Sequence, residues 1–272
     1  MCTNNIDSGE SLFTKKNIDS LFKELAKQYR KLGGKILPAE ITLIGGAAII
    51  ENYSFRAATA DIDALILATS AMKEAIIRVR DAFNLSNDWI NDDFKETSSY
   101  SPRLREFSKH YKDFYGVLEV RTIAAEYLIA MKLRSGREYK HDFSDIVGIL
   151  KEHKENNVAI TQQQISNAVK NLYGGWDNIP SQSLRFLYDV FKDQDYAQKY
   201  EKVSELENQS SRLLAQFVES YPAIVNNSNA NEILHSLLDD TPPVRGVVDF
   251  CEKYKDSNIV SEERKNVDTP HS

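Results

Sequence analysis

The chain has 272 residues, of which 42% are hydrophobic and 27% are charged, a composition typical of globular proteins with one large domain or two smaller ones. Its 34 basic and 40 acidic residues give a net charge of −6, which argues against a protein that coats extended DNA, because such proteins are usually basic. The two cysteines form no disulfide framework or metal motif, and no apolar run reaches membrane-spanning length. We therefore expect a cytoplasmic protein without a membrane partner.

The first half of the chain alternates between helix and strand signals. Residues 17–32 have apolar side chains at helical spacing, and Ser70 is expected to cap a helix that extends to Phe83. Further helices are predicted at 47–50, 124–135 and 142–153, and strands at 41–44, 62–67 and 117–122. Residues 84–114 indicate only mixed helix and loop. The alternation predicts an α/β core of about 150 residues.

After Asn157 the pattern changes to helices alone, at 160–173, 181–191 and 196–221. We therefore predict a core over residues 1–156 and a helical C-terminal region over 157–255. Residues 256–272 are polar and poor in apolar side chains, so a disordered tail is expected there.

The segment with the clearest chemical meaning joins Gly45-Gly46 to Asp61 and Asp63. In a strand, residues i and i+2 point to the same face, so the two aspartates would present their carboxylates together. Such a pair, completed by substrate phosphates, is what Mg²⁺ accepts as ligands. A Gly-Gly turn between a strand and a helix lets backbone N–H groups approach a triphosphate. The alternatives are two solvated side chains and an ordinary turn.

These residues resemble a motif of the nucleotidyltransferase superfamily with the polymerase-β-like fold, in which a Gly-Gly or Gly-Ser turn precedes a strand with two aspartates. The run RAATADID at residues 56–63 resembles the form of that motif in bacterial minimal nucleotidyltransferases. Residues 126–133 and 136–146 are similar to a segment of an uncharacterised bacterial family and, more distantly, of the nucleotidyltransferase toxins of abortive-infection systems. The resemblance covers about residues 40–150 and implies a small mixed sheet flanked by helices.

The resemblance implies a third carboxylate on a neighbouring strand, for which Glu119 is the candidate. It would complete the metal site and act on the attacking hydroxyl; alternatively it is a strand residue paired with Arg121. Lys132 and Arg137 would bind phosphates, and Asp142 would orient one of them or assist the acceptor. The structural alternatives are a lysine whose aliphatic stem packs on a helix and an aspartate that caps the next helix.

The expected reaction is transfer of a nucleoside monophosphate from an NTP to a hydroxyl or amine, with release of pyrophosphate. Asp61, Asp63 and Glu119 would hold Mg²⁺ or Mn²⁺, with Lys132 and Asp142 also catalytic, and Gly45, Gly46, Lys132 and Arg137 would bind the nucleotide. The acceptor stays open among a small molecule, an RNA end and a protein. Two alternatives are a non-catalytic nucleotide- or partner-binding module, and a toxin that modifies tRNA or protein and has an antitoxin as its partner.

Overall fold

The computed structural model describes residues 12–66 and 69–238; the predicted tail at 256–272 lies outside them. The described residues form two compact units. The first contains the described residues up to Gly136 together with Asp145–Ala197, and the second contains Arg137–Ser144 together with the described residues from Gln198 onward. None of the helices in the described part of the chain is both long and apolar enough to cross a membrane.

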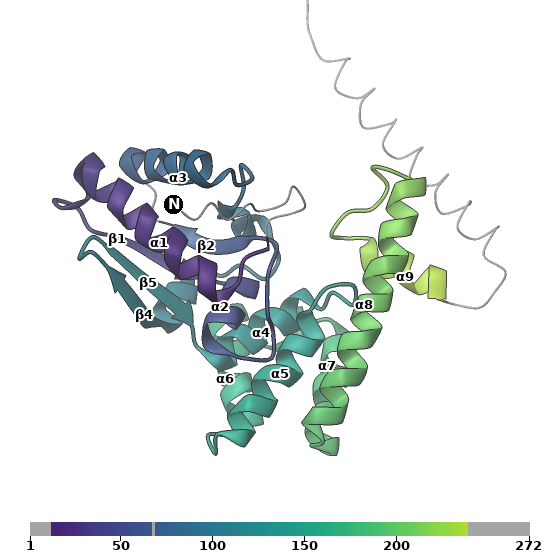
Figure 1. Cartoon of the computed structure of the whole chain (residues 1–272). Helices are drawn as coiled ribbons and strands as arrows, with labels where there is room; N and C mark the ends of the chain where they lie inside the picture. The colour runs from purple at the N-terminus through teal and green to yellow at the C-terminus, as the bar shows by residue number, and fades with distance from the viewer. Residues whose placement is uncertain (1–11, 67–68, 239–272) are drawn as a thin grey trace, which may run out of the picture. The chain divides into compact units, whose positions relative to one another are not determined.

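The first unit is built on a mixed sheet with the strand order β3-β2-β1-β5-β4 (Figure 1). Its strands are β1 (Ala39–Leu43), β2 (Ile62–Ile66), β3 (Ile90–Asn91), β4 (Ser108–Phe114) and β5 (Leu118–Ile123). Strand β1 is central: it pairs antiparallel with β2 and parallel with β5. This mixed α/β architecture confirms the predicted fold class.

Helices pack around this sheet because each presents an apolar stripe. Helices α1 (Lys15–Tyr29) and α3 (Ser70–Phe83) pack against each other. Helix α2 (Gly45–Asn52) connects β1 toward β2, and α4 (Ala125–Ser135) follows β5 and packs on α6 (Gln162–Tyr173) and α7 (Ser181–Asp193). The remaining long helix, α5 (Asp142–Glu155), begins in the second unit and continues in the first.

The second unit contains α8 (Tyr196–Ser220), except for its first two residues, and α9 (Ala230–Leu238). Leu214, Phe217, Ala230 and Ile233 form its core. The buried Glu207 carboxylate of α8 accepts hydrogen bonds from the backbone N–H groups of Phe143 and Ser144, the shortest at 2.7 Å. Glu207 thereby supplies partners for N–H groups that the first turn of a helix leaves unsatisfied.

Four features differ from the sequence prediction. Residues 84–114 contain strand β4 at the sheet edge, whose alternation is interrupted by a register shift between His110 and Lys112. The prediction that Ser70 caps α3 is wrong, because the Thr69 hydroxyl accepts the Met72 N–H and Ser70 is already helical. Helix α9 was not anticipated.

Helices α6 and α7, which were assigned to a C-terminal region, are part of the first compact unit.

Candidate functional site

The site begins at the turn from β1 into α2. Gly45 has φ +53°, in the left-handed region that favours glycine. A Cβ atom built on Gly45 would lie 2.9 Å from the Asp63 Oδ2 atom. The glycine therefore allows the turn to approach the Asp63 carboxylate more closely than any other residue would.

Asp61 and Asp63 flank the first residue of β2. Asp61 is exposed, Asp63 is half-buried, and Ile62 and Ala64 between and after them are buried. This alternation places both carboxylates on the same side of the strand. The Asp63 carbonyl also accepts a 2.9 Å hydrogen bond from the Ile44 N–H, which ties β2 to the residue before the glycines. The structure thus brings Asp63 to the predicted Gly-Gly turn, and Asp61 lies on the same side of β2, two residues before it.

The N-terminus of α2 has no side-chain cap in the described part of the chain. Its first N–H groups therefore have the free hydrogen-bonding capacity and positive partial charge of a helix start. On the Gly46 side, a built Cβ would lie 2.3 Å from Thr59 Oγ1 and 3.1 Å from Arg56 Nη2. The Asp63 carboxylate adjoins Gly45, whereas the Arg56 guanidinium and the Thr59 hydroxyl adjoin Gly46. The turn therefore has a carboxylate on one side and hydrogen-bond donors on the other.

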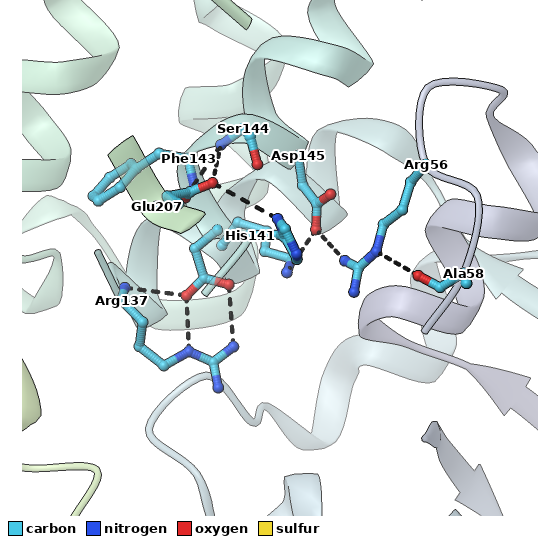
Figure 2. Close-up of polar contacts among 10 residues, drawn as sticks. Arg56, Ala58, Arg137, His141, Phe143, Ser144, Asp145 and Glu207 are labelled. Carbon is cyan, nitrogen blue, oxygen red and sulfur yellow. Dashed lines mark hydrogen bonds and ion pairs between the residues drawn. The ribbon is translucent and has the colours of Figure 1, made fainter. Parts of the chain in front are cut away.

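Lys132 is joined to this region through a buried acid. Its Nζ lies 2.9 Å from Asp145 Oδ2. The same oxygen lies 2.9 Å from Arg56 Nη1 (Figure 2). The Asp145 side chain is 2% exposed, the Lys132 side chain 10% and the Arg56 side chain 18%. One carboxylate thus organises two largely buried cations, which offsets the cost of removing them from water.

The strand register separates Glu119 from the aspartate pair. Glu119 pairs with Glu40 on β1, whereas Asp63 is level with Ile44, four positions farther along. At about 3.3 Å per residue, that offset is about 13 Å along the sheet. Arg121 binds Glu119 and lowers the pKa of this carboxyl through their hydrogen bond. The structure therefore does not bring Glu119 to the predicted metal site, and its contacts match the structural alternative.

Arg137 and Asp142 bind each other in the second unit. Asp142 is fully buried and accepts hydrogen bonds from the Arg137 backbone N–H, Nε and Nη2 at 3.1, 2.9 and 3.1 Å. The dashed lines that leave Arg137 in Figure 2 mark these hydrogen bonds. Such a bidentate pair at the start of α5 is a strong structural contact. Asp145, three residues after Asp142, is a carboxylate that contacts Lys132.

Sequence reasoning missed the roles of Arg56, Thr59 and Asp145, although all three lie inside the quoted motifs. The available signal was the spacing of RAATADID, in which a cation and a hydroxyl come shortly before the two aspartates. Their shared position beside Gly46 could not be inferred from that spacing alone. It depends on the loop after α2 returning to the start of the same helix.

The donor set fits a divalent cation held jointly with a substrate. Within residues 12–66 and 69–238, no group of three or more His, Cys, Asp or Glu side chains is arranged to hold a metal ion. Asp61 and Asp63 offer two hard oxygen ligands, and Mg²⁺ commonly binds one or two carboxylates together with substrate phosphates. A metal ion bound by these two carboxylates would therefore take its remaining ligands from a bound substrate or from water.

Comparison with known proteins identifies the family of the chain. A family model described as a nucleotidyltransferase of unknown function (DUF6036) matches residues 20–195. No curated protein and no solved structure matches the chain. The matched range contains the aspartate pair, the Gly-Gly turn and the Arg56–Asp145–Lys132 cluster.

Proposed function

The chain belongs to this family of nucleotidyltransferases, and from that premise we propose that it transfers a nucleoside monophosphate from an NTP to an acceptor in a metal-dependent reaction. The acceptor is a hydroxyl or an amine, and pyrophosphate is the second product. The observation that carries the proposal is the approach of Asp63 to Gly45 at the uncapped start of α2. A carboxylate beside free backbone N–H groups matches a metal–triphosphate complex, which needs both anionic and N–H ligands.

In this proposal Asp61 and Asp63 hold Mg²⁺ or Mn²⁺, and the N–H groups of Gly45 and Gly46 bind triphosphate oxygens. The bound cation would neutralise phosphate charge and lower the pKa of the acceptor hydroxyl. The acceptor attacks the α-phosphorus, the bond from that phosphorus to the bridging oxygen breaks, and the acceptor proton passes to solvent. Lys132 contributes positive potential through its place in the Asp145 cluster.

One observation favours a second candidate, a nucleotide-binding module without catalysis. Glu119, the expected third carboxylate, lies about 13 Å along the sheet from the level of Asp63. A site with two carboxylates can still bind a metal–nucleotide complex, but it has lost the group that was expected to act on the acceptor. Both candidate functions predict nucleotide binding, but only the first predicts catalytic turnover.

A transfer assay tests the proposal. The protein is incubated with each α-labelled NTP, Mg²⁺ or Mn²⁺, and three acceptor pools: total RNA, protein and small metabolites. We expect label transfer by the wild type and by Asp113→Asn, and none by Asp63→Asn. Asp113 is the matched control, because it is a 66% exposed strand aspartate on β4. Metal-dependent NTP binding without transfer to any pool would favour the binding module.

A further inference from the structure

The Gly46 side of the turn contains two polar groups that the proposed metal chemistry does not use, Arg56 Nη2 and Thr59 Oγ1. We propose that Arg56 and Thr59 form, with the start of α2, a phosphate-binding subsite that does not require the metal, and that Asp145 is the residue that positions Arg56. The proposal rests on the proposed function in one respect only: the natural ligand is then the triphosphate of the NTP.

Arg56 is held so that one donor group remains available. Its Nε donates to the Ala58 carbonyl at 3.1 Å, and its Nη1 donates to Asp145 Oδ2 at 2.9 Å (Figure 2). No described residue accepts a hydrogen bond from Nη2, and this nitrogen lies 3.1 Å from the Cβ position of Gly46. Two fixed bonds orient the planar guanidinium before any ligand arrives, which reduces the entropy lost on binding an anion.

Thr59 provides a second, independent indication of a ligand. The residue is 4% exposed, and its backbone exchanges two hydrogen bonds with Phe13, at 2.7 and 2.8 Å. Its Oγ1 has no hydrogen-bond partner among residues 12–66 and 69–238 and is the atom nearest to the Gly46 Cβ position. A phosphate oxygen bound at the start of α2 would accept the hydrogen bond of the Thr59 hydroxyl.

The charges around the subsite also favour an anion. Arg56 and Lys132 contribute two positive charges and Asp145 one negative charge, so this largely buried triad has a net charge of +1. The start of α2 adds positive partial charge. Asp63, which would repel a phosphate without a cation, adjoins Gly45 rather than Gly46. The Gly45 side of the turn would therefore bind the metal, and the Gly46 side would bind the phosphate.

The role of Asp145 follows from its contacts. Its carboxylate is 2% exposed and has no access to a bulky ligand, so it acts through Arg56 and Lys132 rather than by touching phosphate. Replacing Asp145 with Asn removes the negative charge that orients Nη1 of Arg56. Arg56 would then keep its charge but lose its fixed orientation. We therefore expect Asp145→Asn to weaken anion binding only when Arg56 is present.

The test uses inorganic tripolyphosphate in EDTA, titrated calorimetrically into the folded full-length chain. Loss of a hydrogen bond to a charged group should weaken binding by on the order of tenfold. We expect this for Arg56→Gln, a smaller loss for the nearly isosteric Thr59→Val, and wild-type affinity for Arg105→Gln. Arg105 is the matched control, because Glu40 binds its guanidinium bidentately on a different edge of the first unit.

A double-mutant cycle separates positioning from general stability. Asp145→Asn should weaken tripolyphosphate binding in the wild type but not in the Arg56→Gln background, and unfolding midpoints in urea are measured for every variant. If Asp145→Asn does not fold, Arg56→Gln and Thr59→Val still decide whether the subsite exists. Equal affinity of the wild type and Arg56→Gln would overturn the proposal. The assay contains no metal, base or acceptor, so its result does not depend on whether nucleotidyl transfer is found.

Discussion

Glu119 and Asp63 show how far strand register decides the role of a carboxylate. Both residues face the same side of the sheet, because Glu119 is level with Glu40 and Asp63 with Ile44, an even number of positions apart. The offset nevertheless leaves Glu119 with Arg121 and His110 as its partners. We predict that Glu119→Gln changes the affinity for a Mg²⁺–NTP complex by less than about twofold, measured by calorimetry. A loss as large as that caused by Asp63→Asn would restore Glu119 to the metal site.

Glu51 provides a pH-dependent prediction away from the site. It is 3% exposed on α2, and burial raises the pKa of its carboxyl above the usual value. Because the folded state binds the proton more tightly than the unfolded state, this group favours folding below its unfolded pKa. That contribution is lost as the pH rises through the folded pKa. Glu51→Gln should therefore stabilise the protein at about pH 8, and the gain should shrink toward about pH 5.

Urea unfolding across that pH range measures the effect. The control is Glu219→Gln, an exposed glutamate on α8 that should change stability by less than about 0.5 kcal/mol. A Glu51→Gln variant that is less stable than the wild type at both pH values would show that the buried carboxylate makes a favourable contact in its charged form.

At the scale of the element, α2 is constrained by the space above Gly46. A methyl group there would lie 2.3 Å from Thr59 Oγ1 and 3.0 Å from Thr59 Cβ, and Phe13 holds the Thr59 backbone in place. We predict that Gly46→Ala lowers the free energy of unfolding by about 1–3 kcal/mol through overpacking. Thr59→Ala in the same chain should recover part of this loss, because it removes the closest atom.

Denaturant unfolding of the two single variants and the double variant gives the coupling energy between the positions. Gly175→Ala is the control, because a Cβ built there meets nothing within 4 Å. Independent, additive effects of Gly46→Ala and Thr59→Ala would contradict the close contact.

Most of the helices and three of the strands could be predicted from the sequence. Strands β1, β2 and β5 and helices α1 to α8 follow from apolar periodicity, because each buries one face. Strand β4 does not, because it is a mostly polar edge strand with a bulge. The aspartates and glycines were found through local spacing, whereas Asp145 and the exclusion of Glu119 depend on tertiary contacts and register that no local pattern encodes.

Over the chain as a whole, sequence composition and packing indicate different boundaries between the two parts of the protein. The loss of strand signals after residue 157 predicted a break there, but α6 and α7 pack on α4 within the first unit. In the opposite direction, the second unit includes Arg137–Ser144, whose contacts are with α8 and α9. Composition indicates whether a segment is a helix or a strand, whereas packing determines which elements form one compact unit.

The net charge of −6 leads to a prediction about large ligands. Phosphate neutralisation provides most non-specific affinity for nucleic acid, and the proposed subsite can neutralise only a few phosphates. We expect a generic duplex or single strand to bind no more tightly than roughly 10⁻⁴–10⁻⁶ M at physiological salt, measured by fluorescence anisotropy. Clearly tighter binding with a steep salt dependence would contradict this prediction and would favour the toxin that modifies RNA.

We propose above all that the aspartate pair and the start of α2 bind a metal–nucleotide complex. Calorimetric titration of an NTP analogue with a non-hydrolysable α–β linkage, with and without Mg²⁺, tests it directly in the wild type, Asp63→Asn and Asp113→Asn. We predict Mg²⁺-dependent binding by the wild type and Asp113→Asn, and loss of the Mg²⁺-dependent part in Asp63→Asn, with all three proteins folded. Mg²⁺-dependent affinity that is unchanged in Asp63→Asn would contradict the account.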